Sequence, residues 1–297
     1  MNSRAQAVSV VIPTLGLRVR ESLLRRTVEN VLDQEGVRAV PIVVLNGQEA
    51  DPAVENRLRN DGRVRLIRLE NPTLPGSLDA GRAAVETPWF SELDDDDLFL
   101  PGALARRLRA LEEDREADVV VTNGIRRGPA GDVVHVQDMA RVARDPLDAL
   151  IRGNWLLPGA WLCRTDRVAQ DVFRNIPAFR ECTYLAIQFA SRFRVRYLEE
   201  PTVIWHTDSP ASTSSSPDYV LSGASAIRQL LELDLPPRVR AQYRRGMSEA
   251  LHNAADFHRK AGHLGRAWRS HLASLRWPGG LRYLAFSGRL LFPRPPT

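Results

Sequence analysis

Short β-branched runs alternate with amphipathic stretches through the first 122 residues, and this alternation limits the folds open to the chain. The apolar runs are nearly continuous, which is typical of strands buried inside a parallel sheet. They predict strands at 8–12, 41–45, 64–67, 89–93 and 118–122, with helices at 21–34, 52–60, 77–86 and 101–114. Pro101 is expected to begin the last helix, because a missing N–H costs nothing there. The order predicts an open α/β sheet with helices on both faces, which binds ligands beyond the carboxyl ends of its strands.

A mixed pattern in residues 126–210 predicts a second half that completes the same sheet. Here we expect a hairpin segment at 133–136, strands at 160–163 and 194–198, and helices at 146–152 and 181–191. The Ser- and Pro-rich run 209–217 predicts a lid or a linker, and helices are predicted beyond it at 218–233, 237–261 and 264–275. We therefore expect one α/β domain over residues 1–210, whose halves divide near residue 125, and a C-terminal helical region over residues 218–297.

Composition narrows the class of protein. The chain has 297 residues, 43% apolar and 26% charged, which excludes disorder, collagen-like repeats and a disulfide scaffold. Its two cysteines, Cys163 and Cys182, fit a reducing compartment. No window has the roughly 18 apolar residues of a membrane-spanning helix. We therefore expect a cytoplasmic protein.

Positive charge is concentrated at the C-terminal end of the sequence. Residues 236–297 carry twelve Lys or Arg against Glu249 and Asp256, whereas the whole chain is only +5. This asymmetry fits an anionic partner, such as lipid headgroups at the inner face of a membrane or a phosphorylated acceptor, and it fits a plain solvated basic face equally well. Nucleic acid is not expected, because no binding motif accompanies the charge. Four histidines in this region match no metal spacing and are expected on solvated helix positions: His252, His258, His263 and His271.

Four adjacent carboxylates, Asp94 to Asp97, follow the predicted strand at 89–93. Such a cluster repels itself unless a cation neutralises it. Carboxylates at a strand end, with water or phosphate completing an octahedron, suit Mg²⁺ or Mn²⁺. The alternative is an acidic turn before a helix, where Asp is favoured by the helix dipole. Four Asp behind an apolar strand favour the metal site.

These motifs resemble family 2 glycosyltransferases of the GT-A fold. Members open with a Val-Ser-Val-Val-Ile-Pro-Thr type strand and carry a Leu-Asp-x-Asp-Asp segment followed by Pro-Gly-x-Leu. This chain has Val8-Ser-Val-Val-Ile-Pro-Thr14, then Leu93 to Asp97, then Pro101-Gly-Ala-Leu104. The resemblance covers about residues 7–210. It implies a Rossmann-like α/β fold with a mixed, mainly parallel sheet flanked by helices. It also implies inverting transfer of a sugar from a nucleotide-diphosphate donor of UDP, dTDP or GDP type, aided by Mg²⁺ or Mn²⁺.

The resemblance also assigns donor-site roles. Pro13 and Thr14 would line the nucleotide pocket, and Asn46-Gly47 stands where the family usually has an Asp that contacts base or ribose. Arg82 would lie near the diphosphate, where a fixed cationic fork is useful. In the acidic run, Asp96 is the leading metal ligand, while Asp94 would contact ribose or the ion. Asp95, the third candidate of the acidic run, would contact the nucleotide sugar. His206 would be a metal or phosphate ligand, a role for which Asp208 competes.

The catalytic base is the main departure from the family pattern. Members supply it from a Glu-Asp pair at the start of a helix, and the equivalent stretch here has Glu181 and Cys182. Three alternatives stay open: Glu181 is the base, Cys182 is the base, or the enzyme acts without a conventional base or not at all. Glu181 is favoured, because a thiol is a poor base at neutral pH unless its pKa is lowered.

Trp155 and Trp161 stand where the family builds its acceptor wall, and flat aromatic faces suit sugar rings. The acceptor classes implied are a glycan, as in polysaccharide biosynthesis, a lipid-linked acceptor or a small molecule. Two other functions remain as alternatives. One is a non-catalytic nucleotide-sugar-binding protein on the same scaffold, and the other is a nucleotidyltransferase, although its Gly-rich basic loop after the first strand is not present.

Overall fold

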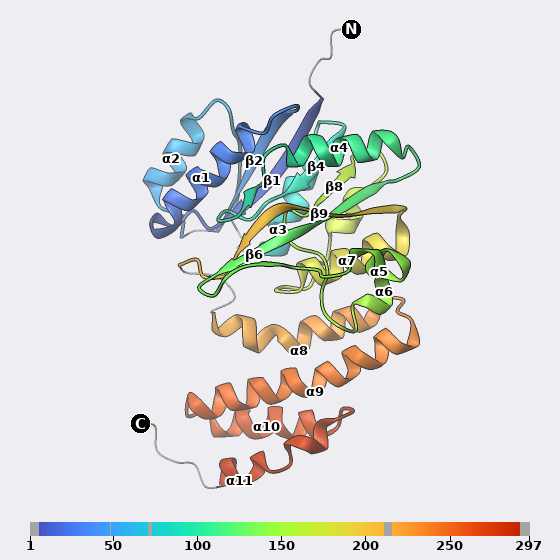
Figure 1. The fold of residues 1–297 in the computed structure, drawn as a ribbon. Helices are drawn as coiled ribbons and strands as arrows, with labels where there is room; N and C mark the ends of the chain where they lie inside the picture. Colours follow the sequence, from blue (N-terminus) through green and yellow to red (C-terminus); the bar gives the residue numbers. More distant parts are fainter. Residues whose placement is uncertain (1–5, 48, 71–72, 211–215, 292–297) are drawn as a thin grey trace. The chain divides into compact units, whose positions relative to one another are not determined.

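The protein is seen here as a computed structural model that describes residues 6–47, 49–70, 73–210 and 216–291 (Figure 1). Packing divides the chain into two compact units. The first unit comprises Met1–Ile176 with Glu181–Ala211, and the second comprises Pro177–Arg180 with Ser212–Thr297. No helix among the described residues is long and apolar enough to cross a membrane.

A nine-stranded mixed sheet forms the centre of the first unit, with the order β3-β2-β1-β4-β8-β6-β9-β5 and β7 paired to β6. Strands β3, β2, β1 and β4 are mutually parallel, and β6 and β9 run in the same direction, whereas β8, β5 and β7 are antiparallel to their neighbours. The strands are β1 Ala7–Thr14, β2 Arg38–Asn46, β3 Arg65–Leu69, β4 Trp89–Glu92, β5 Leu98–Phe99, β6 Val119–Gly128, β7 Gly131–Val134, β8 Trp161–Arg164 and β9 Val195–His206.

Helices cover both faces of this sheet. Apolar side chains of α1, α2 and α4 share one core cluster with Val8, Val10 and Ile12 of β1, and Figure 1 shows these helices along one face. Helix α3 lies on the other face, where a Cβ at Gly81 would come within 2.3 Å of Val11, so only glycine permits this close approach. The helices are α1 Glu21–Leu32, α2 Pro52–Asn60, α3 Leu74–Ala83, α4 Ala103–Glu113, α5 Met139–Arg144, α6 Pro146–Ala149 and α7 Glu181–Arg192, with 3₁₀ turns η1 Arg18–Arg20 and η2 Gln170–Phe173.

The second unit is helical. It contains α8 Pro217–Glu232, α9 Pro237–Lys260, α10 Leu264–Leu275, the 3₁₀ turn η4 Gly280–Tyr283 and α11 Phe286–Leu291. Ser216 caps α8 by accepting a hydrogen bond from the backbone N–H of Tyr219, and Pro217 follows at the first helical position. The expectation of a lid or linker at 209–217 falls partly on residues 211–215, which lie outside the described residues.

The expected α/β fold with a mixed, mainly parallel sheet is confirmed, and several local expectations are wrong. Strand β6 runs to Gly128 rather than ending at 122, and α3 spans Leu74–Ala83 rather than 77–86. Helix α4 begins at Ala103 rather than Pro101, because Gly102 takes a left-handed conformation at its N-cap. Strand β9 extends eight residues beyond 198, to His206. His271 is completely buried and hydrogen-bonded to Ser287, rather than solvated, because α10 turns it into the core of the second unit.

Candidate active site

The carboxyl ends of β1, β2 and β4 meet at one edge of the sheet. Thr14 at the end of β1 is in register with Leu45, the residue before Asn46 on β2. On the other side of β1, Val11 is in register with Glu92, the last residue of β4. Pro13, Thr14, Asn46, Gly47 and the acidic run therefore gather at this edge, where α/β sheets bind ligands.

Helix α1 fixes the backbone of the acidic run. Arg26 donates to the carbonyl of Asp96 at 2.7 Å, and Thr27 donates to the carbonyl of Asp97 at 2.9 Å. One turn later, Asn30 bonds both the N–H and the carbonyl of Phe99, at 2.8 and 3.0 Å. These polar residues share one side of α1, because positions three and four apart are neighbours on a helix. The loop that carries the carboxylates is thus held along its length.

Asp94, Asp96 and Asp97 form a cluster of carboxylates. One oxygen from each lies within 4.8 Å of the others, close enough to share one metal ion. Burial and the neighbouring carboxylates raise the pKa of Asp94 and of Asp97 well above their usual range. The Oδ2 atom of Asp97 is buried and has no hydrogen-bond partner among the described residues. An all-oxygen donor set with an unpartnered buried oxygen fits a hard divalent cation.

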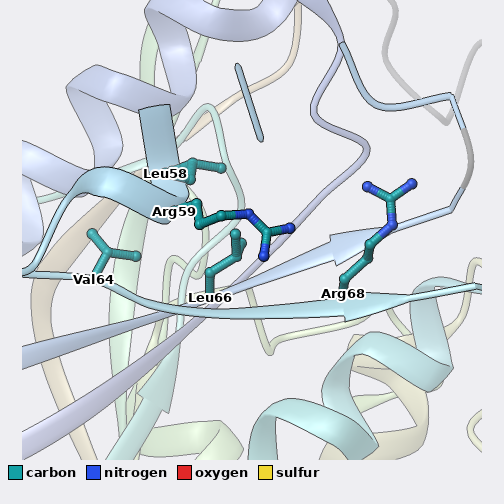
Figure 2. Close-up of a pocket in the computed structure, with 5 residues that line it drawn as sticks. All are labelled: Leu58, Arg59, Val64, Leu66 and Arg68. Atoms are coloured by element: carbon teal, nitrogen blue, oxygen red, sulfur yellow. The ribbon is translucent and has the colours of Figure 1, made fainter. Parts of the chain in front are cut away.

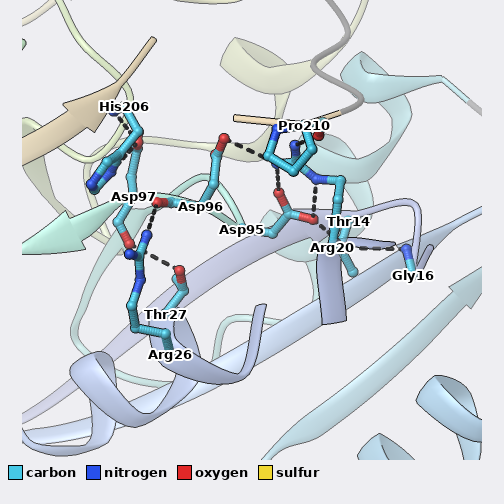
Figure 3. Close-up of polar contacts among 10 residues, drawn as sticks. All are labelled: Thr14, Gly16, Arg20, Arg26, Thr27, Asp95, Asp96, Asp97, His206 and Pro210. Atoms are coloured by element: carbon cyan, nitrogen blue, oxygen red, sulfur yellow. Dashed lines mark hydrogen bonds and ion pairs between the residues drawn. The ribbon is translucent and has the colours of Figure 1, made fainter. Parts of the chain in front are cut away.

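The Asp95 side chain contacts Arg20 and Thr14 rather than the other three carboxylates (Figure 3). Its carboxylate accepts a hydrogen bond from Thr14 Oγ1 at 2.6 Å and is paired with the Arg20 guanidinium. Arg20 also lies 3.1 Å from an oxygen of Asp96 and donates to the carbonyl of Pro210 at 2.7 Å. Although burial acts against it, the bonds and charges of both aspartates raise the pKa of Arg20. Asp95, expected to contact the nucleotide sugar, is thus engaged by Arg20 and Thr14, and the carboxylate that clusters with Asp94 and Asp96 is that of Asp97.

His206 ends β9 beside the cluster. Its backbone N–H donates to Asp97 Oδ1 at 2.8 Å, and its ring Nδ1 lies 3.6 Å from the same oxygen. Burial, followed by the charge of Arg26, lowers the pKa of the imidazole. A neutral ring beside Asp97 is suited to act as a metal ligand. His206 thus lies beside the carboxylate cluster, although it is not one of the three clustered residues.

Glu181 and Cys182 begin α7 and face the same acidic edge. The charges of Glu92, Asp94 and Asp97 all act on the Cys182 thiol, which burial holds at a pKa well above its usual range. Glu92 is buried, accepts a hydrogen bond from the Trp161 indole at 3.2 Å, and has its pKa raised to about 7 by burial and by the charge of Glu181. The structure therefore brings both expected base candidates to the carboxylates.

Asn46 and Gly47 shape the end of β2. The Asn46 side-chain oxygen accepts from the backbone N–H of Thr73 at 2.9 Å, which ties β2 to the cap of α3. Gly47 has φ of 108°, a backbone conformation that favours glycine, and donates to the carbonyl of Leu69 at 3.1 Å. The Asn46 side chain thus has a structural role, because it holds the end of β2 to the residue that caps α3.

Three residues expected to contact donor or acceptor are instead packed in the interior of the fold. The Arg82 guanidinium donates to the backbone carbonyls of Thr165 and Val168 and stacks on the Phe90 ring at 4.6 Å, which differs from the expected place near a diphosphate. Trp155 and Trp161 are only 3% and 1% exposed, so neither offers a ring face to an acceptor. The fold uses these indoles as core side chains because large aromatic residues bury the most apolar area.

A pocket of about 350 Å³ lies between α2 and the edge strand β3, away from the acidic run (Figure 2). Two of its arginines, Arg59 and Arg68, pair with Glu55. Because β2 and β1 separate β3 from β4, this pocket is not part of the candidate site. It is lined by Leu58, Arg59, Val64, Leu66 and Arg68.

Comparison with known proteins agrees with this geometry. The family model described as glycosyl transferase family 2 matches residues 9–189, more than half of the chain. The chain belongs to glycosyl transferase family 2. Membership places it among the glycosyltransferases, as its motifs predict.

Relatives of this family 2 glycosyltransferase include a curated protein and solved structures. The chain is 35% identical over 137 residues to the succinoglycan biosynthesis protein ExoO of Rhizobium meliloti (strain 1021), covering 44% of this chain and 38% of ExoO. It thus spans well under half the length of that relative. S. aureus TarS 1–349 in complex with UDP-GlcNAc is similar with a TM-score of 0.58 and 14% identity, over 91% of this chain and 81% of that one. Another S. aureus TarS structure has a TM-score of 0.53 and 17% identity, over 87% and 45%. At these identities the structures show a shared fold.

Sequence reasoning did not single out three residues that the structure places at this candidate site. Asp97 was available from the acidic run itself, and Glu92 from its place at the end of an apolar strand, where a buried carboxyl is unusual. Arg20 carried no signal, because nothing in the spacing links it to Asp95, 75 residues away.

Proposed function

We propose that this family 2 glycosyltransferase transfers a sugar from a nucleotide-diphosphate donor to a glycan, lipid-linked or small-molecule acceptor, with inversion and with Mg²⁺ or Mn²⁺. The observation that carries the proposal is the gathering of Asp94, Asp96 and Asp97 within 4.8 Å, at the edge that Glu181 and Cys182 also face. A TarS structure similar in fold contains UDP-GlcNAc, which supports a donor of this class.

On the donor side, Asp96 with Asp94 and Asp97 would hold the metal ion, and His206 stands beside them. The ion would supply charge neutralisation for the departing diphosphate. Pro13 and Thr14 at the end of β1, with Asn46 and Gly47 at the end of β2, would bound the nucleotide. Because α1 fixes the backbone of the acidic run, these groups are preorganised, which is what electrostatic catalysis requires.

On the acceptor side, Glu181 is the proposed base. It would take the proton of the acceptor hydroxyl as that oxygen bonds to the anomeric carbon, while the bond to the diphosphate breaks and its electron pair leaves with phosphate. Cys182 is not suited to this role, because burial and the surrounding carboxylates raise the pKa of its thiol and keep it protonated at neutral pH.

The test is thermal shift of the whole chain with UDP, GDP, dTDP and CDP, each with and without Mn²⁺. A ligand that binds only the folded state at a hundredfold excess over its Kd stabilises by about 2.7 kcal/mol. We expect one diphosphate to stabilise the chain only when metal is present, and its sugar to be transferred. Binding without transfer or donor hydrolysis would favour the non-catalytic alternative. Release of pyrophosphate from a nucleoside triphosphate and a sugar phosphate, supplied in a separate assay, would favour a nucleotidyltransferase. No stabilisation by any of the four would contradict the donor site.

Peripheral contact with a membrane through residues 236–297 is the remaining part of the proposal. It is supported by the excess of Lys and Arg in this segment. A lipid-linked acceptor would be met at such a surface.

A further inference from the structure

Exposed apolar side chains are concentrated near the end of the second unit. Leu281, Leu284 and Leu291 are 73%, 57% and 63% exposed. Apolar side chains this exposed are unremarkable singly, but a group of them marks an interaction surface. Leu264 and Leu272 on α10 are also exposed.

The three leucines lie close together in the chain, over residues 281–291. Leu281 is in η4, Leu284 is in the turn that follows, and Leu291 is the last residue of α11. Phe286 and Leu290 of the same stretch are 5% and 3% exposed and pack into a cluster with α9 and α10. The core of the unit thus takes up these two side chains, and the three leucines are left exposed.

Basic side chains accompany these leucines along the chain. The sequence has no Asp or Glu after Asp256. Arg276, Arg282 and Arg289 are exposed in the same stretch. Arg282 stacks on the Tyr283 ring at 4.7 Å and pairs with Glu249 at 3.5 Å, whereas Arg276 and Arg289 add charge beside it. A second copy of the chain would bring like charges together at such a surface, whereas acidic headgroups would neutralise them.

We infer that Leu281, Leu284 and Leu291, with the surrounding arginines, form a docking surface for a membrane that contains anionic lipids. Apolar side chains enter the boundary between headgroups and acyl chains, and the arginines stay at the level of the phosphates. The inference rests on the proposed function in one respect: a membrane-bound enzyme would meet a lipid-linked acceptor at this surface.

The test is cosedimentation of the whole chain with vesicles of phosphatidylcholine, with and without phosphatidylglycerol. We expect binding only to the anionic vesicles, weakening as salt is added. Leu281→Ser/Leu284→Ser should weaken binding at least about a hundredfold, because each leucine moved out of water contributes roughly tenfold or more. Arg276→Gln/Arg289→Gln should weaken it on the order of thirtyfold, because each cation near the surface contributes about 1 kcal/mol.

Matched controls lie in the first unit. Val133→Ser/Val134→Ser removes two exposed apolar side chains, and Arg109→Gln/Arg115→Gln removes two exposed arginines, so both pairs should bind as the unchanged chain does. Equal binding to neutral vesicles, or equal loss in variants and controls, would overturn the inference. So would leucine-dependent dimers in light scattering, which would indicate a second copy as the occupant.

The two proposals fail separately. Metal-dependent donor binding should be unchanged in the Leu281→Ser/Leu284→Ser chain, and circular dichroism should show its helices retained. Lost vesicle binding by the unchanged chain with donor binding kept would remove the docking surface and the proposed membrane contact, but not the proposed sugar transfer. Vesicle binding without any donor binding would remove the proposed sugar transfer, but not the docking surface.

Discussion

Arg20 and Asp95 form a buried ion pair at the acidic edge of the sheet. The guanidinium also lies 3.1 Å from a carboxylate oxygen of Asp96 and donates to the Pro210 carbonyl, while Asp95 accepts from Thr14. One arginine therefore joins the ends of β1 and β4 to the chain that follows β9. It places a fixed positive charge among four carboxylates.

Removing one member of this pair should be costly. Arg20→Gln leaves the buried Asp95 carboxylate uncompensated, and we expect a loss of roughly 3–5 kcal/mol in the free energy of unfolding. Asp95→Asn should also destabilise, and the double variant should lose less than the sum of the two single losses. Denaturant unfolding of all four chains measures this coupling. Strictly additive losses would contradict a direct pairing.

Asp96→Asn should abolish metal-dependent stabilisation by the donor and reduce transfer by at least about a hundredfold, because a missing charge at the ion lowers stabilisation of the leaving diphosphate. The fold should survive, since the backbone of the run is held by Arg26 and Thr27. Thermal shift with and without Mn²⁺ and a transfer assay measure both effects. Asp33→Asn, at an exposed position after α1, is the matched control and should leave both unchanged.

The sequence was sufficient for the alternation of strands and helices, because buried strands and amphipathic helices leave periodic apolar patterns. It also located the acidic run and the start of α7. It was not sufficient for contacts between distant positions, such as Arg20 with Asp95 or Arg82 with Val168, since no local pattern encodes them. The sequence also did not predict which large side chains are buried.

Trp161 is an example of a side chain whose burial the sequence did not predict. A tryptophan in a sequence is compatible with an acceptor wall and with a core, and only the packing of its ring against Phe90 and Phe189 distinguishes them. Strand β5 was not predicted, because a strand of two residues is too short to show the alternation of apolar and polar side chains.

Glu181→Gln should lower kcat by at least about a hundredfold with little change in KM for the donor, because a general base contributes roughly 10²–10⁴ to the rate. Cys182→Ser should stay within a few fold of the unchanged chain, since the raised pKa keeps the thiol protonated. Steady-state transfer kinetics measure both. The reverse pattern, with Cys182→Ser inactive and Glu181→Gln active, would assign the base to the thiol.

Arg107 is completely buried in α4 and has no carboxylate among its hydrogen-bond partners in the described structure. It donates to Thr202 Oγ1 and the Trp161 carbonyl and stacks on Phe99, and burial lowers its pKa to about 9. The Trp161 carbonyl keeps another donor without it, because Ser91 donates to it at 2.5 Å, and the Thr202 hydroxyl keeps its hydrogen bond with the Thr122 hydroxyl at 2.5 Å.

Arg107→Met should therefore cost little, within about 1 kcal/mol, because it removes a buried charge and leaves no acceptor without a partner. Arg107→Ala should cost roughly 2–5 kcal/mol, since it leaves a cavity beside Phe99. Denaturant unfolding compares the two variants. A larger loss in Arg107→Met than in Arg107→Ala would show that the charge itself stabilises the fold.

The second unit should lose stability as pH falls, through the buried His271 and the half-buried His252. His271 is 0% exposed, bonds Ser287 at 2.8 Å and has a buried Nδ1 without a partner among the described residues, and burial lowers its pKa from 6.5. Burial also lowers the pKa of His252, which stacks on Tyr283. The unfolded chain thus binds protons at a higher pH than the folded unit does.

Stability from these histidines is therefore fully present above about pH 6.5 and is lost as pH falls through that value, by at most about 1.4 kcal/mol per pH unit for each group. Hydrogen exchange of the amides in α9, α10 and α11 measures this separately from the first unit. His271→Gln should flatten the pH dependence, because glutamine keeps a polar contact but does not titrate. His263→Gln, at an exposed position, is the control and should leave the slope unchanged. An unchanged slope in His271→Gln would assign the acid sensitivity to other groups.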